Sequence, residues 1–196
     1  MAVYEPTIKV LESVPQGQAV NLVVRHSVRY PILKADDVPS APLTPEGIRV
    51  AEEFGAVLAK NYRLDGLESS EIGRCVETAA AIGRGARRQG DVRLEPRFTY
   101  TYTDDLWHTR REHLFAHALP DEVVDVMDYL TQFPTRQHGL NIFVTHDSVL
   151  GVLAGYLFRN FVDGDSWPEF LEGMAVWRQN GDVFAAWRGE VKAIRL

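Results

Sequence analysis

Short apolar runs alternate with longer amphipathic stretches along the chain. Residues 20–24 (VNLVV) are apolar apart from Asn21, and a second apolar run, NIFVT, ends at Thr145. Runs of this length and composition predict strands buried on both faces, as in the middle of an α/β sheet. A helical pattern follows each run, and this alternation indicates the α/β class.

Three segments have the period of an amphipathic helix. Thr44 is placed as an N-cap with Pro45 at the first helical position, and apolar residues recur along one face of residues 48–58. A second helix is expected from about residue 71 to 90, and a third over residues 123–130. These helices would pack their apolar faces on the sheet.

Two further elements are expected in the C-terminal part. A nearly all-apolar helix should start just after Asp147. Residues 173–194 alternate around Asn180-Gly181, which predicts a β-hairpin because these two residues favour a tight two-residue turn.

Length and composition indicate one globular domain over residues 1–196. The chain is 45% hydrophobic and 24% charged, enough for one sizeable core. A net charge of -6 argues against nucleic acid and anionic membranes as partners. The sequence shows no signal peptide and no membrane span, and its single cysteine, Cys75, permits no intrachain disulfide, so we expect a cytoplasmic protein.

Polar residues whose side chains could take part in binding or catalysis follow three predicted strands. Arg25, His26 and Arg29 follow the first, Ser69, Ser70 and Arg74 follow the second, and His146 and Asp147 follow the third. Ligands of open α/β sheets bind beyond the carboxyl ends of the strands, so these groups are expected to form one pocket. Like charges repel, and an anion between the arginines would explain why they lie together.

Such a pocket is suited to phosphoryl chemistry. Three guanidinium groups offer forked donors to phosphate oxygens, and a helix N-terminus at Arg74 adds backbone N–H groups. A neutral histidine held beside the phosphate can attack phosphorus, a second can donate to its equatorial oxygens, and a protonated Asp147 can supply the proton of the leaving alkoxide.

Four motifs resemble those of the histidine phosphatase superfamily, which includes histidine acid phosphatases and phosphoglycerate mutase-like enzymes. They are RHSVRYP (25–31), LTPEG (43–47), SSEIGRCVETA (69–79) and VTHD (144–147), in family order over about two thirds of the chain. The resemblance implies a three-layer α/β/α sandwich with a mostly parallel central sheet, phosphoglycerate mutase-like. One departure is Ser27, which stands where the family usually has glycine.

The resemblance also implies the roles of the site residues. His26 would carry the phosphoryl group, Asp147 would be the proton donor, and Arg25, Arg29, Arg74 and His146 would bind phosphate, with His146 also counted as catalytic. The predicted activity is that of a metal-independent phosphomonoesterase, acting on a small-molecule phosphate ester without a cofactor. A phosphoglycerate mutase-like phosphotransferase and a non-catalytic phospho-ligand binding module remain the alternatives.

Several assignments stay open on the sequence alone. Asp147 could be only a helix N-cap, since aspartate is a preferred cap. Residues 91–120 are a candidate lid or cap segment, and Ser27, Tyr100, Tyr102, Trp107 and His108 are candidates for the substrate wall. No complete metal-binding pattern is found, so no metal site is predicted, and the natural substrate and the oligomeric state are left undetermined.

Overall fold

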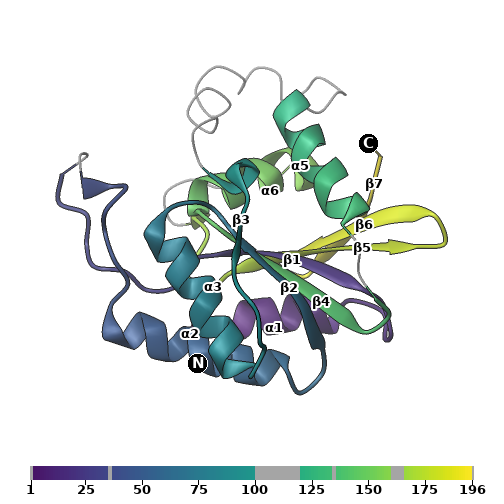
Figure 1. Ribbon diagram of the computed structural model, residues 1–196. Coiled ribbons are helices and arrows are strands. Elements are labelled where there is room, and N and C mark those ends of the chain that lie inside the picture. Colours follow the sequence, from purple (N-terminus) through teal and green to yellow (C-terminus); the bar gives the residue numbers. More distant parts are fainter. Residues whose placement is uncertain (1, 35–36, 100–119, 134–135, 160–165, 196) are drawn as a thin grey trace.

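The computed structural model describes residues 2–34, 37–99, 120–133, 136–159 and 166–195. Its centre is a seven-stranded sheet in the order β3-β2-β4-β1-β5-β6-β7 (Figure 1). The strands are β1 (Val20–Arg25), β2 (Arg63–Ser69), β3 (Arg93–Leu94), β4 (Gly139–Thr145), β5 (Gly173–Gln179), β6 (Asp182–Trp187) and β7 (Glu190–Ile194). Strands β3, β2, β4 and β1 are parallel to one another, and β5, β6 and β7 extend the sheet in antiparallel pairs.

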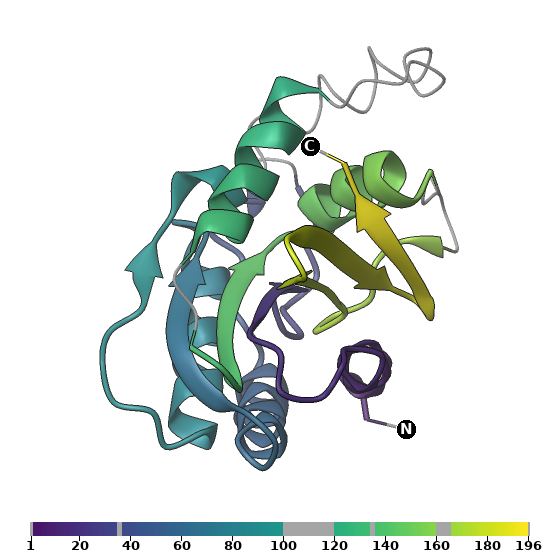
Figure 2. The same cartoon turned by 90° about the vertical axis from the view of Figure 1, so that its right-hand side faces the viewer.

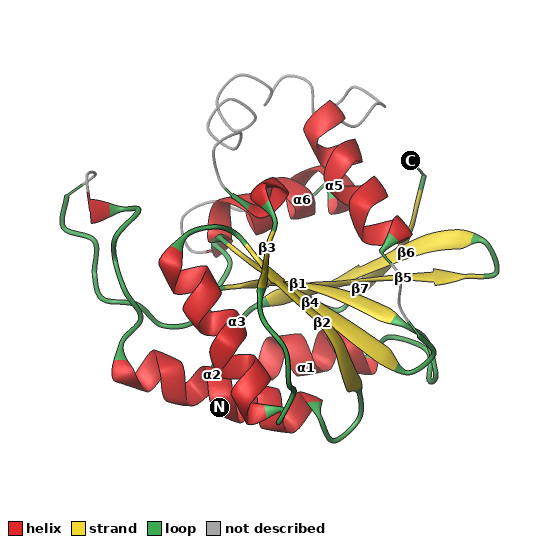
Figure 3. Ribbon diagram, in the orientation of Figure 1, coloured by secondary structure: helices red, strands yellow, loops and turns green. Residues whose placement is uncertain are grey.

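Helices cover both faces of the sheet, as Figure 3 shows, and the predicted three-layer α/β fold is confirmed. The helices are α1 (Glu5–Glu12), α2 (Pro45–Leu58), α3 (Gly73–Gly85), α5 (Asp121–Gln132), α6 (Asp147–Phe158) and the short 3-10 helix η2 (Pro96–Phe98). Figure 2 shows α1, α2 and α3 on one face of the sheet and α5 and α6 on the other. Each set of helices forms its own apolar cluster with the sheet.

Strands β1 and β4 lie side by side in the middle of the sheet and are buried along their whole length. Their parallel register pairs Arg25 with Thr145, the last residue of each strand. The backbone N–H of His26 donates to the carbonyl of Thr145 at 2.9 Å, which extends the ladder one step beyond the strands. The segments that follow β1 and β4 therefore begin side by side.

Helix α2 starts as the sequence predicts. The Thr44 side chain accepts a hydrogen bond from the N–H of Gly47 at 2.9 Å, and Pro45 occupies the first helical position. A Cβ atom added to Gly47 would lie 2.0 Å from the carbonyl oxygen of Val28. The loop after β1 thus rests directly on the first turn of α2, and this approach requires glycine.

Two predicted helix boundaries shift, while the hairpin at Asn180-Gly181 is confirmed by the β5-β6 pair and by positive φ angles at both turn residues. Helix α3 ends at Gly85 rather than near residue 90, because the chain turns at Arg87, whose φ is +53°. Helix α6 begins at Asp147 itself. The candidate lid, residues 91–120, contains β3 and η2, and its residues 100–119 lie outside the described part of the chain.

We expect Gly47→Ala to destabilise the protein and to displace the loop that carries His26. The new methyl group would meet backbone at 2.0 Å, which the surroundings cannot relieve by a side-chain rotation, so a loss of about 1–3 kcal/mol is expected. Urea unfolding measures it. The matched control is Gly73→Ala, at an exposed helical position where a Cβ meets nothing within 4 Å, and it should be neutral or stabilising by up to about 1 kcal/mol. Equal effects of the two substitutions would contradict this account.

Candidate active site

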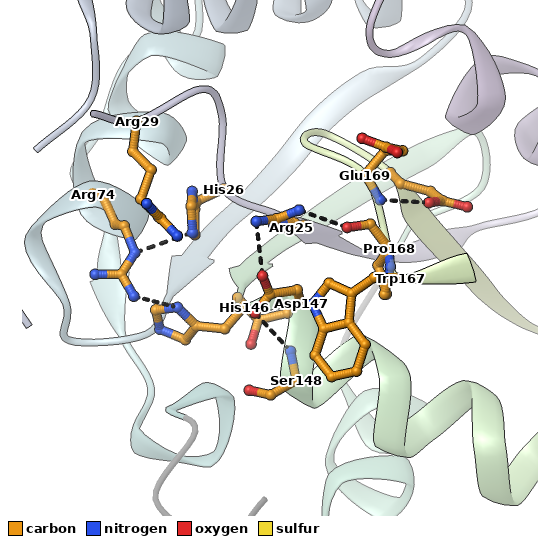
Figure 4. Close-up of polar contacts among 12 residues, drawn as sticks. Arg25, His26, Arg29, Arg74, His146, Asp147, Ser148, Trp167, Pro168 and Glu169 are labelled. Atoms are coloured by element: carbon orange, nitrogen blue, oxygen red, sulfur yellow. Dashed lines mark hydrogen bonds and ion pairs between the residues drawn. The ribbon is translucent and has the colours of Figure 1, made fainter. Parts of the chain in front are cut away.

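The predicted site residues meet at the carboxyl ends of β1, β2 and β4. Figure 4 shows the side chains of Arg29 and Arg74 reaching toward the His26 ring, with His146 beside Arg74 and Asp147 beside Arg25. The rings of His26 and His146 lie 5.7 Å apart between centroids. Segments that are far apart in sequence thus form one polar cluster.

The protonation of His26 follows from its hydrogen bonds. Its Nδ1 lies 2.8 Å from the carbonyl oxygen of Ser27, which can only accept, so Nδ1 carries the proton. The Nε2 atom then holds a lone pair, and this lone pair accepts a bond from Nε of Arg74 at 3.0 Å. Burial lowers the pKa of His26 well below 6.5, and Arg25 and Arg74 lower it further. His26 is therefore a neutral imidazole with its unprotonated nitrogen on the side of Arg74.

Arg74 connects the two histidines. While its Nε donates to His26, its Nη2 lies 3.1 Å from Nδ1 of His146, and its Nη1 donates to the carbonyl of Val38 at 2.5 Å. The side chain is held in the first turn of α3 and is 5% exposed. One guanidinium group thus sets the distance and orientation of both imidazoles.

His146 is the second neutral imidazole. Because Arg74 can only donate, Nδ1 of His146 accepts, and its protonated Nε2 lies 3.0 Å from Oγ of Ser70. Burial lowers the pKa of His146 to about 3, and the charge of Arg74 acts in the same direction. The Cys75 thiol, 3.5 Å from Nε2, is itself buried, and burial raises its pKa to about 12, so it fills space beside the ring as a neutral group.

Arg25 and Asp147 form an ion pair beside the histidines. Nη2 of Arg25 lies 2.7 Å from Oδ2 of Asp147, whose side chain is 25% exposed, while Oδ1 accepts from the N–H of Ser148. The N-cap position of α6 belongs to His146, and Asp147 is the first helical residue. Asp147 therefore lies beside the cations of the site, with one oxygen on its own helix and one on Arg25.

The cluster has an excess of positive charge. Three arginines and one carboxylate in the charged form give a formal charge of +2 around two neutral histidines. The Nε–H groups of Arg25 and Arg29 are buried and have no hydrogen-bond partner within the described residues. Buried donors without acceptors are costly, and an anion with several oxygens would satisfy them. The arrangement is suited to binding a phosphoryl group against Nε2 of His26.

The loop that carries His26 is fixed by two hydroxyl groups. The backbone N–H of Ser27 donates to Oγ1 of Thr78, which in turn donates to the carbonyl of Arg74. The Ser27 hydroxyl donates to the carbonyl of Gly47 at 2.7 Å, and the residue is fully buried. Its O–H is committed to α2, so the assignment of Ser27 to the substrate wall is replaced by a structural role. The other wall candidates, Tyr100, Tyr102, Trp107 and His108, lie outside the described residues.

The segment of residues 166–172, which precedes β5, also contacts the site and was not predicted from the sequence. Nη1 of Arg25 donates to the carbonyl of Pro168 at 2.6 Å, and the Arg25 guanidinium lies 4.1 Å from the centre of the Phe170 ring. The Phe170 ring is also 5.7 Å from that of His26. The segment has neither the period of a helix nor that of a strand. Its one distinctive feature in the sequence is the pair of aromatic residues at the two ends of WPEF (167–170).

Two absences apply to the described part of the chain. No group of three or more His, Cys, Asp or Glu side chains is placed to hold a metal ion among these residues. No helix among them is long and apolar enough to cross a membrane.

Residues 24–99 match the histidine phosphatase superfamily (branch 1). The predicted resemblance is confirmed. The matched stretch contains Arg25, His26, Arg29 and Arg74, while His146 and Asp147 lie beyond it. No curated protein sequence matches the chain.

Solved structures of the same fold include phosphatases and a mutase. A phosphoglycerate mutase from Bacillus anthracis superposes with a TM-score of 0.57 at 14% identity, covering 92% of this chain and 93% of its own. YhfR of Bacillus stearothermophilus gives 0.57 at 18% identity, with 88% and 98% covered. A mycobacterial glucosyl-3-phosphoglycerate phosphatase in complex with VO3 gives 0.52 at 17% identity, with 88% and 100% covered. At these identities the likeness shows the fold.

The two neutral imidazoles should reduce stability on mild acidification. Their folded-state pKa values lie below 6.5, so the unfolded chain binds protons that the folded protein does not. The free energy of unfolding should therefore fall as the pH drops below 6.5, by about 1.4 kcal/mol per pH unit for each such histidine. For His146 the fall continues toward pH 3. Urea unfolding at pH 6.5, 5.5 and 5.0 measures it.

His146→Gln removes one of the two groups and should show a shallower fall than the parent protein. The surface substitution His138→Gln controls for the loss of a histidine as such. Parallel slopes for the parent and His146→Gln would mean that His146 is not held neutral in the folded state.

Proposed function

We propose that the protein is a phosphomonoesterase that hydrolyses a small phosphate ester through a phosphohistidine on His26. The observation that carries the proposal is the state of Nε2 of His26, an unprotonated nitrogen on the inner side of a cluster of three arginines. A neutral nucleophile surrounded by cations is what attack on an anionic phosphate ester requires.

The reaction has two displacements at phosphorus. Before the first, Asp147 takes a proton from solvent as the bound ester replaces it on Arg25. Nε2 of His26 then forms a bond to phosphorus, the ester P–O bond breaks with its electron pair on oxygen, and the leaving alkoxide takes that proton from Asp147. In the second, water attacks phosphorus, Asp147 accepts a proton from that water, and the P–N bond breaks to return neutral His26 and inorganic phosphate. Arg25, Arg29 and Arg74 offset the charge on the phosphoryl oxygens in both steps.

Arg74 must change partners for the first displacement to occur. In the structure its Nε–H occupies the lone pair of His26 that would attack phosphorus. A phosphate oxygen is a stronger acceptor than a neutral imidazole, because the hydrogen bond is then assisted by charge on both sides. Substrate binding would therefore move Arg74 from His26 to the phosphoryl group and expose the nucleophile in the same event.

The solved structures of the same fold support this class of activity. One is described as a phosphatase in complex with VO3, an oxyanion of the same kind as phosphate. Another is a phosphoglycerate mutase, so transfer between sugar acids is the alternative outcome of the assay. The presence of both histidines and Asp147 favours turnover over binding alone.

The first test is the chemistry of the trapped intermediate. Rapid quenching with labelled substrate should give a phosphoprotein that is stable in alkali and lost in acid, as expected for a phosphoramidate. His26→Ala should abolish this label and lower kcat by at least about a thousandfold, because the covalent route is removed. Assays contain EDTA. An acid-stable label, or undiminished turnover in His26→Ala, would overturn the proposal.

The second test concerns the leaving group. Asp147→Asn should lower kcat/KM about a hundredfold or more for alkyl phosphates, whose alkoxide needs a proton, and less than about tenfold for p-nitrophenyl phosphate. The matched control is Asp125→Asn, which breaks an Arg97–Asp125 ion pair on the surface of α5 and should leave both substrates unaffected. Equal losses for the two substrates in Asp147→Asn would mean that Asp147 acts by holding Arg25 and not as the acid.

A further inference from the structure

Arg25 is held from one side by the segment 166–172. Pro168 accepts a hydrogen bond from Nη1 at 2.6 Å, and the Phe170 ring covers the guanidinium face at 4.1 Å. The opposite contact is the ion pair of Nη2 with Asp147. These three contacts leave Nε of Arg25 without a partner among the described residues, which is the donor that a phosphoryl oxygen could use.

We propose that Phe170, Glu172 and Arg188 are positioning residues that act together to orient the Arg25 guanidinium for anion binding. None of the three belongs to the motifs that identify the site. The inference rests on the anion-binding part of the proposed function and does not depend on turnover.

An ion pair fixes the ends of the segment. Nε and Nη2 of Arg188 lie 2.6 Å and 3.0 Å from the two carboxylate oxygens of Glu172, so the pair is bidentate. The Glu172 side chain is 4% exposed. Nη1 of Arg188 also donates to the carbonyl of Ser166 at 2.8 Å. A single guanidinium in the turn after β6 thus joins the first and last residues of the segment.

Glu172 also links this ion pair to the site through its own backbone and side chain. One carboxylate oxygen of Glu172 accepts from the N–H of Glu169 at 2.7 Å, and the backbone carbonyl of Glu172 accepts from the N–H of Arg25 at 2.9 Å. The Glu172 carboxylate therefore closes the turn that presents Pro168 and Phe170. A bidentate, largely buried pair has the geometry that makes a contact specific.

Leu171 shows that the turn is held by its surroundings. Its φ is +55°, a left-handed conformation that is unfavourable for a bulky side chain, and the residue is fully buried. The Thr7 hydroxyl donates to its carbonyl at 2.6 Å. This backbone geometry places Phe170 on the Arg25 side of the chain and Leu171 in the apolar cluster of α1 and α2.

The test follows Arg25 directly by NMR and the site by titration with inorganic phosphate. Phe170→Leu keeps an apolar side chain and removes the ring face, so phosphate affinity should fall about fivefold and the Arg25 Nε–H resonance should lose its ring-current shift. Arg188→Lys keeps the charge and loses the fork, and it should change the same resonance although Arg188 does not touch Arg25.

The double variant decides whether the residues act as one unit. If they act through the same segment, Phe170→Leu with Arg188→Lys should lose no more phosphate affinity than the weaker-binding single variant. Losses that multiply would show independent effects and overturn the proposal. So would an unchanged Arg25 resonance in Phe170→Leu, a half-buried position that can be tested even if Arg188→Lys does not fold.

Two control substitutions separate positioning from general packing. Phe184→Leu alters another half-buried ring, which stacks on Trp177 on β5, and Arg84→Lys alters the Arg84–Glu52 ion pair between α3 and α2. Both should leave phosphate affinity and the Arg25 resonance unchanged, and a fall equal to that of the test variants would overturn the assignment. If the parent protein hydrolyses no phosphate ester while phosphate affinity responds to the single and double variants as expected, the proposed function is refuted and this inference stands.

Discussion

The parallel pairing of β1 with β4 is the constraint on which the site depends. Its register places Arg25 against Thr145, so that His26 and His146 are the first residues after two adjacent strands. The hydrogen bond from His26 N to the Thr145 carbonyl extends this alignment into the site itself. A shift of one residue would turn either histidine to the other face, because side chains alternate along a strand.

Helix α3 adds the third side of the site through packing and not through strand pairing. Thr78 binds the backbone of Ser27 and also the carbonyl of Arg74, so the helix and the loop that carries His26 are fixed to each other. The close approach of Val28 to Gly47 fixes the same loop on α2. Two helices and one strand therefore determine where a single imidazole stands.

Much of the site could be predicted because strand ends are visible in the sequence. Apolar runs that are followed directly by Arg25 and His146 indicate both a strand and the polar groups at its end. The topology of α/β sheets brings these strand ends together. The contacts of Phe170 and Arg188 could not be predicted in this way, because the Phe170 ring reaches Arg25 and Arg188 reaches Glu172 only through a turn geometry that no residue pattern encodes. The hydrogen bond of the Ser27 hydroxyl could not be predicted either, because it depends on where α2 packs.

The hydrogen bond between Arg74 and His26 limits which molecules can react with the His26 ring in the resting protein. A buried imidazole whose lone pair already accepts a hydrogen bond is a poor target for neutral electrophiles and a poor ligand for metal cations, which the surrounding arginines repel. Only a species that first attracts Arg74 frees the nitrogen. In the proposed reaction the His26 nitrogen therefore becomes available only when a negatively charged group arrives, so that anionic molecules are selected before any bond to His26 forms.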